Sequence, residues 1–316
     1  MSRHAPGGLV EPSLFRLARA VRDSGYQFVT PTPATHARVN ARPGAEWARD
    51  LRDVFGWSRP FREGVVPAGI VTAMRDAGVL AAAPGGWRSL VRLSSLGGLL
   101  FLHSAYPTTQ ADAVFFGPDT YRFAQAIEAH LDCRTHSVHR AVDIGCGAGP
   151  GAILMARRQP GAEVLAVDIN EAALRLTRAN AALAGVAVHA VRSDLLSGTA
   201  GEFDLIVANP PYLVDAGERA YRHGGGPLGA GLSLAIVQAA RDRLAPGGTL
   251  LLYTGAAVVN GTDSFRAETD SCLAGSGLDW TYNELDPDVF GEELDEEPYA
   301  SADRIAAVLL TAIRPG

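Results

Sequence analysis

Short apolar runs alternate with helical segments along the chain from about residue 138 onward. Five runs consist mainly of Val, Leu, Ile and Ala and are read as strands: "RAVDIG", "AEVLAVDI", "VAVHAVRSD", "FDLIVANP" and "GTLLLYTG". Helical segments lie between most of them, at residues 150–158, 171–184 and 230–244. Strands that are apolar almost throughout, with helices between them, predict a parallel sheet that is covered on both faces.

The C-terminal part of the chain adds two more strands, at residues 278–285 and 304–313. The connection between them is too short for a full helix, which favours an antiparallel pair. The sequence therefore predicts a Rossmann-like α/β fold with a seven-stranded, mainly parallel sheet whose last strand is reversed. The acidic segment 284–299 joins the two strands and is expected to be a solvated loop, or a surface that repels nucleic acid or docks a basic peptide.

The first 110 or so residues follow a different pattern, because strand and helix do not alternate there. Helices are predicted at residues 12–24, 46–55 and 67–78. The segment "GGWRSLVRLSSLGGLLFLHSAY" then predicts a hairpin of two short strands around a glycine turn. We expect a smaller N-terminal α+β domain over 1–110, either winged-helix-like or a cap over the substrate pocket, and a second domain over 111–316.

Composition favours a reduced, compact protein. The chain of 316 residues is 47% apolar, which is enough for a sizeable core in about two domains. Its three cysteines show no metal-ligand or disulfide spacing, so no metal site is expected. The N-terminus lacks the apolar core of a signal peptide, and no apolar stretch reaches the ~18 residues of a membrane span. A cytoplasmic protein without membrane contact is therefore expected, and its oligomeric state is unknown at this point.

Charge is distributed unevenly along the chain. The net charge is −6, yet residues 1–110 hold 13 Arg against 7 Asp and Glu, whereas residues 111–316 hold 15 Arg against 27 Asp and Glu. The chain has no lysine, which we attribute to genomic base composition. The basic N-terminal part is a candidate surface for a nucleic-acid or ribosomal partner, although its arginines are scattered.

A glycine-rich loop, "VDIGCGAGPGA" at residues 142–152, follows the first strand of the sheet and opens a helix. Such a loop lets a ligand approach the backbone and offers free N–H groups at the helix start. Dinucleotide-binding enzymes use the same arrangement, but their GxGxxG spacing from Gly145 would need glycine where Pro150 stands. Asp143 at the strand end would also repel a pyrophosphate and suits a cationic ligand.

Polar residues end the next three strands as well. Asp168 ends the second strand ~20 residues after the glycine loop, where a carboxylate can accept hydrogen bonds from ribose hydroxyls. Asp194 ends the third strand, and "NPPY" at residues 209–212 follows the fourth. Because open α/β sheets bind ligands at the carboxyl ends of their strands, these residues predict one shared site.

This order of motifs resembles the class I S-adenosylmethionine-dependent methyltransferases over roughly residues 115–316. The "NPPY" tetrapeptide narrows the resemblance to the amino-methylating branch of release-factor glutamine methyltransferases and enzymes that methylate exocyclic base amines. The segment "FFGPDTYRF" is similar to the element of this branch that closes over the cofactor, with Asp119 and Thr120 as a partial match. The resemblance implies S-adenosylmethionine as cofactor, with its methionine part at the glycine loop and Asp143, its ribose at Asp168 and its adenine at Asp194. The implied cofactor-binding residues are Thr120, Asp143, Gly145, Cys146, Gly147, Asp168, Ile169, Asp194, Leu195 and Asn209.

The tetrapeptide has a chemical use in such an enzyme. An amide or aryl amine nitrogen is a poor nucleophile because its lone pair is delocalised. If the side-chain oxygen of Asn209 and the carbonyl of Pro210 each accept one N–H, the lone pair is held in line with the sulfonium–methyl bond. Pro210 and Pro211 fix the direction of that carbonyl, and Tyr212 can stack on a planar amide or base. Asn209, Pro210 and Tyr212 are therefore the predicted catalytic residues, and Pro211 joins them in binding the substrate.

The predicted function is methyl transfer from S-adenosylmethionine to a planar nitrogen. The acceptor is a glutamine side chain of a protein, such as a release factor or ribosomal protein, or an exocyclic base amine of ribosomal RNA. A small-molecule N-methyltransferase, a dehydrogenase and a non-catalytic cofactor-binding protein are the alternatives. The segment 221–233 stands where the glutamine branch has further substrate contacts; its glycines predict a flexible lid, with His223 either solvated or a general base.

Overall fold

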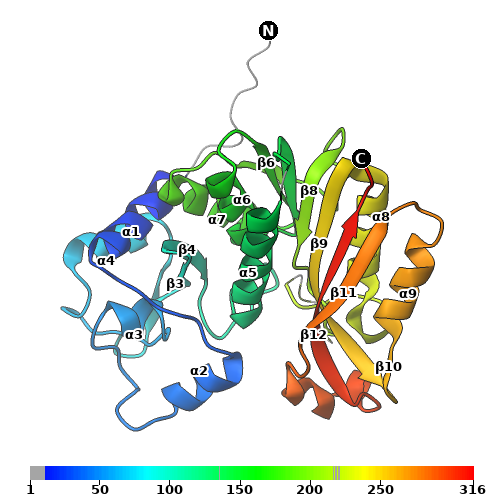
Figure 1. Cartoon of the computed structure of the whole chain (residues 1–316). Helices are drawn as coiled ribbons and strands as arrows, with labels where there is room; N and C mark the ends of the chain where they lie inside the picture. Colours follow the sequence, from blue (N-terminus) through cyan, green and yellow to red (C-terminus); the bar gives the residue numbers. More distant parts are fainter. Residues whose placement is uncertain (1–10, 135, 216, 218, 220) are drawn as a thin grey trace.

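The computed structural model describes residues 11–134, 136–215, 217, 219 and 221–316, and a single central sheet organises them (Figure 1). Its strand order within these residues is β11 (Asp279–Asp286), β12 (Arg304–Ile313), β9 (Leu244–Val259), β8 (Phe203–Ala208), β5 (Arg140–Ile144), β6 (Glu163–Asp168) and β7 (His189–Arg192). Strands β5 to β9 are parallel, whereas β12 is antiparallel to both of its neighbours. The predicted Rossmann-like sheet with a reversed last strand is confirmed. The short β10 (Thr262–Asp263), which pairs with β9, was not predicted.

Helices cover both faces of the sheet (Figure 1). One face packs against α5 (Pro118–Cys133), α6 (Pro150–Arg158) and α7 (Glu171–Ala184), and the other against α8 (Gly231–Arg243) and α9 (Ser264–Leu273). Neighbouring residues of one strand enter different cores: Ala141 packs with α5 and α6, and Val142 with α8. The strands are apolar on both faces for this reason. None of the helices in the described ranges is both long and apolar enough to cross a membrane.

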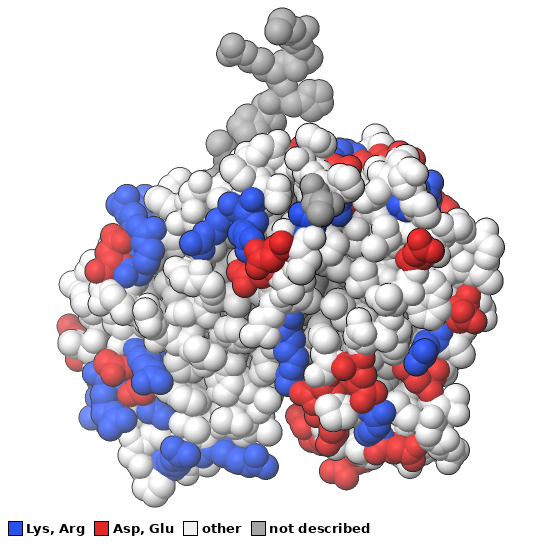
Figure 2. Space-filling model, viewed as in Figure 1, with Lys and Arg blue, Asp and Glu red and all other residues white. Residues whose placement is uncertain are grey.

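The acidic connection between β11 and β12 forms two short 3-10 helices, η2 (Gly291–Asp295) and η3 (Glu297–Tyr299). Most of its acidic side chains are exposed, as expected of a solvated segment, but Glu293 is buried and pairs with Arg222. This ion pair joins the connection to the glycine-rich segment that contains η1 (Pro227–Gly229). Figure 2 shows acidic side chains gathered over η2 and η3, and arginines spread over the N-terminal part.

Four helices and two hairpins form the described N-terminal part. The helices are α1 (Pro12–Asp23), α2 (Pro33–Asn40), α3 (Leu51–Phe55) and α4 (Ala68–Asp76), and the hairpins pair β1 (Leu80–Ala83) with β2 (Gly86–Ser89) and β3 (Val91–Leu96) with β4 (Leu99–Ser104). The predicted helix over 46–55 is wrong at its start. The Asp50 side chain accepts a hydrogen bond from the Asp53 N–H (2.8 Å) and caps a helix that begins only at Leu51. The α2 helix and the β1–β2 hairpin were not predicted.

The N-terminal part shares a buried core with the helices that cover the sheet. Leu17, Met74 and Leu93 belong to the same apolar cluster as Ile153 of α6 and Leu176 of α7. Apolar contact is therefore continuous from the N-terminal helices to the sheet-covering layer. The domain boundary near residue 110 stays a prediction.

A buried asparagine also joins these two parts by hydrogen bonds. Asn180 in α7 is fully buried, and its side-chain oxygen accepts from the Leu102 N–H (2.8 Å). Its side-chain nitrogen donates to the carbonyls of Leu102 (2.9 Å) and Ala148 (2.8 Å). Leu102 lies in β4 and Ala148 in the glycine-rich loop, so one side chain ties the β3–β4 hairpin to the loop that follows β5.

We expect Asn180→Ala to lower the free energy of unfolding by about 2–4 kcal/mol, because three backbone polar groups would lose a partner where water has little access. Denaturant titration measures this loss. Asn283→Ala, on the exposed edge of β11, is the matched control and should change stability by less than about 0.5 kcal/mol. Equal losses for the two variants would contradict a role for Asn180 in joining the two parts.

Candidate active site

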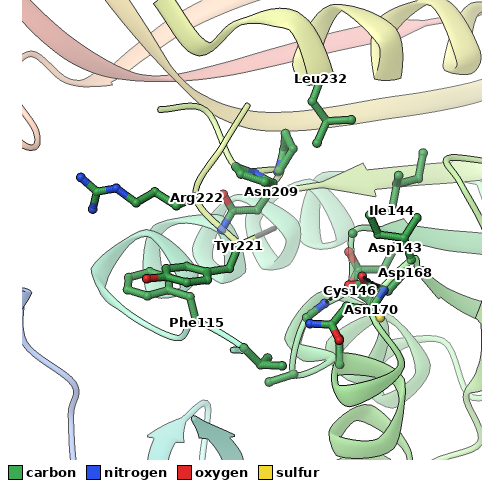
Figure 3. A pocket seen from close by; sticks show the side chains of 18 of the residues that line it. Phe115, Asp143, Ile144, Cys146, Asp168, Asn170, Asn209, Tyr221, Arg222 and Leu232 are labelled. Atoms are coloured by element: carbon green, nitrogen blue, oxygen red, sulfur yellow. Dashed lines mark hydrogen bonds between the residues drawn. The ribbon is translucent and has the colours of Figure 1, made fainter. Parts of the chain in front are cut away.

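A cavity of about 220 Å³ lies at the carboxyl ends of β5, β6, β7 and β8 (Figure 3). All of the predicted cofactor-binding residues and the whole "NPPY" tetrapeptide line it: Thr120, Asp143, Gly145, Cys146, Gly147, Asp168, Ile169, Asp194, Leu195, Asn209, Pro210, Pro211 and Tyr212. The fold therefore brings together residues from four strand ends and from the start of α5. Their roles in binding and catalysis stay predictions.

The glycine-rich loop has glycine where backbone conformation or space requires it. Gly149 precedes α6 with φ of +83°, in the left-handed region that favours glycine. A Cβ atom at Gly151 would lie 2.7 Å from the Asp143 carboxylate. The first turn of α6 can therefore close on the carboxylate at the end of β5.

Asp143 is a buried acid inside this turn. It accepts a hydrogen bond from the Ala152 N–H (2.9 Å), and no arginine is among its partners in the described chain. Burial raises its pKa to about 7, since a charge in a low-dielectric surrounding is disfavoured; the neighbouring Asp168 adds to this rise and the Ala152 bond opposes it. A cation placed in the cavity would stabilise the ionised form of Asp143.

Asp168 at the end of β6 keeps acceptor capacity for a ligand. Its carboxylate accepts from the N–H groups of Gly147 (3.0 Å) and Asn170 (2.8 Å), and burial raises its pKa. An ionised carboxylate has about four acceptor positions, so about two remain. Asn170 caps α7, because its side-chain oxygen accepts from the Ala172 N–H (2.9 Å).

An apolar edge lies next to these carboxylates. Ile169 is 55% exposed although it is large and apolar, and Leu195 adopts a φ of +48° just after the exposed Asp194. All three residues line the cavity. An apolar surface beside a carboxylate suits a flat ring that carries an amino group.

The "NPPY" backbone is supported from behind by the glycine-rich segment after it. A Cβ atom at Gly224 would lie 2.7 Å from the Pro211 carbonyl oxygen, and one at Gly229 would overlap the Tyr212 carbonyl oxygen. The Gly224 N–H donates to the Leu213 carbonyl (2.8 Å). The segment predicted as a lid therefore lies directly on the tetrapeptide backbone. Asn209 is half-buried and lines the cavity, where Figure 3 shows it near the Tyr221 ring.

His223 of the same segment is not among the described residues that line the cavity. Its Nδ1 accepts a hydrogen bond from the Asp215 N–H (3.2 Å), which closes a turn of the chain. The proposal of His223 as a general base stays an untested prediction, and its observed bond is a structural one.

Two aromatic rings that the sequence analysis did not place in the site face each other at the cavity (Figure 3). The rings of Phe115 and Tyr221 are 6.2 Å apart between centroids and 12° from parallel. The Tyr221 hydroxyl donates to the Thr108 carbonyl (2.6 Å), which ties the segment after "NPPY" to the chain that precedes α5. Phe115 was named only within the "FFGPDTYRF" motif and Tyr221 only within the segment 221–233, and neither ring was predicted to line the site.

A buried acid lies behind the tetrapeptide. Asp119 accepts hydrogen bonds from the Tyr253 hydroxyl (2.7 Å) and from Arg122 (3.3 Å), and burial raises its pKa. The Tyr212 hydroxyl is buried near this carboxylate and has no hydrogen-bond partner within the described part of the chain. Tyr212 is thus mostly buried, with its ring against Gly255, and its stacking on a substrate stays a prediction.

Comparison with known proteins gives a match to the family model described as methyltransferase small domain, over residues 123–259. The release factor glutamine methyltransferase of Deinococcus radiodurans is 42% identical over 124 residues, which are 36% of this chain and 44% of the relative. The ribosomal RNA small subunit methyltransferase C of Serratia proteamaculans is 33% identical over 108 residues, 32% of this chain and 31% of the relative. The predicted resemblance to methyltransferases is confirmed.

A third relative acts on a small molecule by its name. The 4-amino-L-phenylalanine/4-methylamino-L-phenylalanine methyltransferase of Streptomyces pristinaespiralis is 32% identical over 152 residues, 44% of this chain and 52% of the relative. The chain thus spans between about a third and about half of the length of these three relatives.

The raised pKa of Asp143 predicts a pH dependence of stability. The fold favours the protonated acid, so this contribution is complete below the unfolded-state pKa of 3.8 and is lost as the pH rises through about 7. Asp143→Asn is uncharged and can still accept from Ala152. Between about pH 4 and pH 7, wild type should lose up to about 4 kcal/mol of unfolding free energy relative to this variant, measured without ligands. A difference that does not change with pH would contradict the assignment.

Proposed function

Since residues 123–259 match the methyltransferase small-domain family, we propose that this chain transfers a methyl group from S-adenosylmethionine to a planar nitrogen. One observation carries the proposal: a single cavity contains both the acidic strand ends and the Asn209 amide. The β5 strand lies between β6 and β8, so Asp143 stands between Asp168 and Asn209 in the sheet. The part of the cavity that would bind the cofactor and the part that would bind the methyl acceptor would therefore be adjacent.

The donor set fits S-adenosylmethionine, whose ammonium and sulfonium groups are cationic. The buried Asp143 carboxylate would take the charge of the methionine part, with the glycine loop around it. The two remaining acceptor positions of Asp168 would take the ribose hydroxyls. Asp194 would accept from the adenine amine, with Ile169 and Leu195 against the ring. When bound, the cofactor would supply an electrophilic methyl group.

The other part of the cavity, around Asn209 and Pro210, would orient the target nitrogen. The Asn209 side-chain oxygen and the Pro210 carbonyl would each accept one N–H of the target, which fixes the nitrogen's orientation. Methylation would make the target nitrogen acidic, so it could give its proton to water, and this chain would not need to supply a strong base. Gly224 and Gly229 lie against the backbone of Pro211 and Tyr212, and this contact would restrict the tetrapeptide, with the Pro210 carbonyl, before the substrate arrives.

The acceptor class is the finer part of the proposal. The three relatives are named for a glutamine side chain, a ribosomal RNA and 4-amino-L-phenylalanine, all of which carry a nitrogen attached to an sp² carbon. We propose a protein glutamine or a ribosomal RNA base as acceptor, supported by the arginines of the N-terminal part (Figure 2). A small-molecule amine is the second candidate, supported by the amino-acid methyltransferase among the relatives.

Asn209→Ala should reduce methyl transfer by about 100-fold or more, because one of the two groups that orient the nitrogen is lost. Its affinity for S-adenosylmethionine, measured by calorimetry, should stay within a few-fold of wild type. Asp168→Ala is the reciprocal control and should weaken cofactor binding by about tenfold or more. Full turnover in Asn209→Ala would refute the mechanism, and cofactor binding without any turnover in wild type would favour a non-catalytic protein.

Turnover is measured with cell lysate from a strain that lacks the gene, purified enzyme and methyl-labelled cofactor. Separate digestion with protease and with ribonuclease then identifies the acceptor. Release of label by either digestion supports the corresponding macromolecule, whereas label that passes a size filter before digestion identifies a small molecule. The Asn209→Ala protein serves as the background sample.

Gly229→Ala should lower turnover by about tenfold or more, because its Cβ would overlap the Tyr212 carbonyl and displace the tetrapeptide. Gly225→Ala is the matched control: its φ of +69° is also left-handed, but its Cβ would meet no atom within 4 Å. Cofactor affinity should be similar in both variants. If the two lose turnover equally, backbone strain and not support of the tetrapeptide explains the effect.

A further inference from the structure

A second, smaller cavity lies in the N-terminal part, behind the aromatic rings of the main cavity. Its volume is about 10 Å³, which is close to the space that one water-sized atom needs. Its lining includes Thr30, His36, Arg92, His103 and Phe115. Phe115 also lines the main cavity, so the two cavities meet at this residue.

Arg92 in this cavity is a buried cation without an acidic partner. The residue is 5% exposed, and none of the described carboxylates forms an ion pair with it. Its Nε donates to the Gly56 carbonyl (3.0 Å), its Nη2 makes a long bond to the Thr30 hydroxyl (3.4 Å), and its guanidinium lies 5.6 Å from the centre of the Phe28 ring. These are neutral partners, so the positive charge is not compensated. Burial lowers the pKa of Arg92 to about 10, which still leaves it charged at neutral pH.

A second buried arginine in the N-terminal part, Arg59, is paired with a carboxylate, as buried arginines usually are. Arg59 is 6% exposed, and its Nη1 donates to the Asp53 carboxylate over 2.7 Å. A buried charge is costly unless it is paired, so paired arginines are the norm in protein interiors. Arg92 is therefore buried as deeply as Arg59, but it lacks the carboxylate partner that Arg59 has.

The other polar groups of the cavity do not supply that anion. The Nε2 of His36 bonds to the Trp57 carbonyl (2.8 Å), and its Nδ1 is buried without a partner in the described chain. His103 bonds to the Ser94 hydroxyl (2.7 Å) and to the Ser104 carbonyl (3.1 Å). Burial lowers the pKa of both histidines, and the Arg92 charge adds to this effect, so they are neutral at neutral pH. The cavity is electropositive as a result.

We propose that Arg92 and this cavity bind one oxygen of an anionic group, a carboxylate or a phosphate. The volume fits a single oxygen, and the guanidinium supplies a charge-assisted hydrogen bond to it. Tyr221, whose ring lines the main cavity, donates to the Thr108 carbonyl, and Thr108 lines the small cavity. The two cavities therefore adjoin. An acceptor molecule with its target nitrogen at Asn209 would place an anionic group of the same molecule in the small cavity. This last assignment rests on the proposed function, whereas anion binding itself does not.

Thermal unfolding of the full chain tests anion binding without any methyl transfer. Sodium phosphate and sodium formate are titrated separately against sodium chloride of equal ionic strength. Binding to the folded state should raise the wild-type midpoint by about 2 °C or more in phosphate, in formate or in both. A response to phosphate alone points to a phosphate-bearing acceptor, and a response to formate alone to a carboxylate-bearing one.

Arg92→Met removes the charge and keeps much of the side-chain volume, so it should abolish the anion response. Its midpoint in chloride alone should equal or exceed that of wild type, because the uncompensated charge is gone. Arg88→Met removes an exposed arginine of β2 and should keep the full response. A merely structural Arg92 would give the opposite result, with a lower midpoint in chloride.

Wild type that shows no response to either anion, or Arg92→Met that keeps the response, would overturn the proposal. If Arg92→Met does not fold, Arg92→Lys replaces it as the test. Lysine retains a charge but not the guanidinium geometry, so the anion concentration at half-response should rise by at least about threefold. An unchanged concentration dependence in Arg92→Lys would also count against the site.

Discussion

A parallel sheet that is buried on both faces leaves its strand ends as the places where polar side chains can meet a ligand. Interior positions such as Val142 and Val207 enter apolar cores on opposite faces of the sheet. Asp143 is the last but one residue of β5, Asp168 is the last residue of β6, and Asn209 directly follows β8. Because β5 lies between β6 and β8, residues far apart in the sequence become neighbours at one edge. The glycine-rich loop, the caps and the cavity all depend on this arrangement.

Each of the two cavities described above is lined by a buried ionisable side chain that has no oppositely charged partner in the described chain. Most acidic and basic groups in the described chain are exposed or paired, as in Arg59 with Asp53 and Arg222 with Glu293. Asp143 at the large cavity and Arg92 at the small one are buried without an oppositely charged neighbour. Fixed charges of this kind cost stability in the free protein, and they are ready to interact with a ligand without reorganisation. The polarity of the two cavities is opposite, acidic where a cationic cofactor is proposed and basic where an anion is proposed.

The sequence predicted the sheet well because local and tertiary signals agree there. Helix α7 begins after Asn170 and ends before Gly185, as capping rules require, and its apolar spacing faces the sheet. The α2 helix was missed because "PATHARVN" has little apolar periodicity and buries a histidine. Tyr221 comes to the cavity through an irregular segment, which carries no periodic signal. The Tyr212 ring is buried against Gly255, which is distant in the sequence, so its burial could not be predicted from the tetrapeptide itself.

Asn180 connects the β3–β4 hairpin of the N-terminal part to the glycine-rich loop of the sheet. One amide satisfies both backbone groups of Leu102 and also holds Ala148 of the glycine-rich loop. A displacement of the β3–β4 hairpin relative to that loop would break bonds that water has little access to replace, so these bonds oppose independent motion of the two segments. A ligand at the loop and a ligand in the N-terminal part would then contact one connected unit, and any coupling between their affinities would be reciprocal.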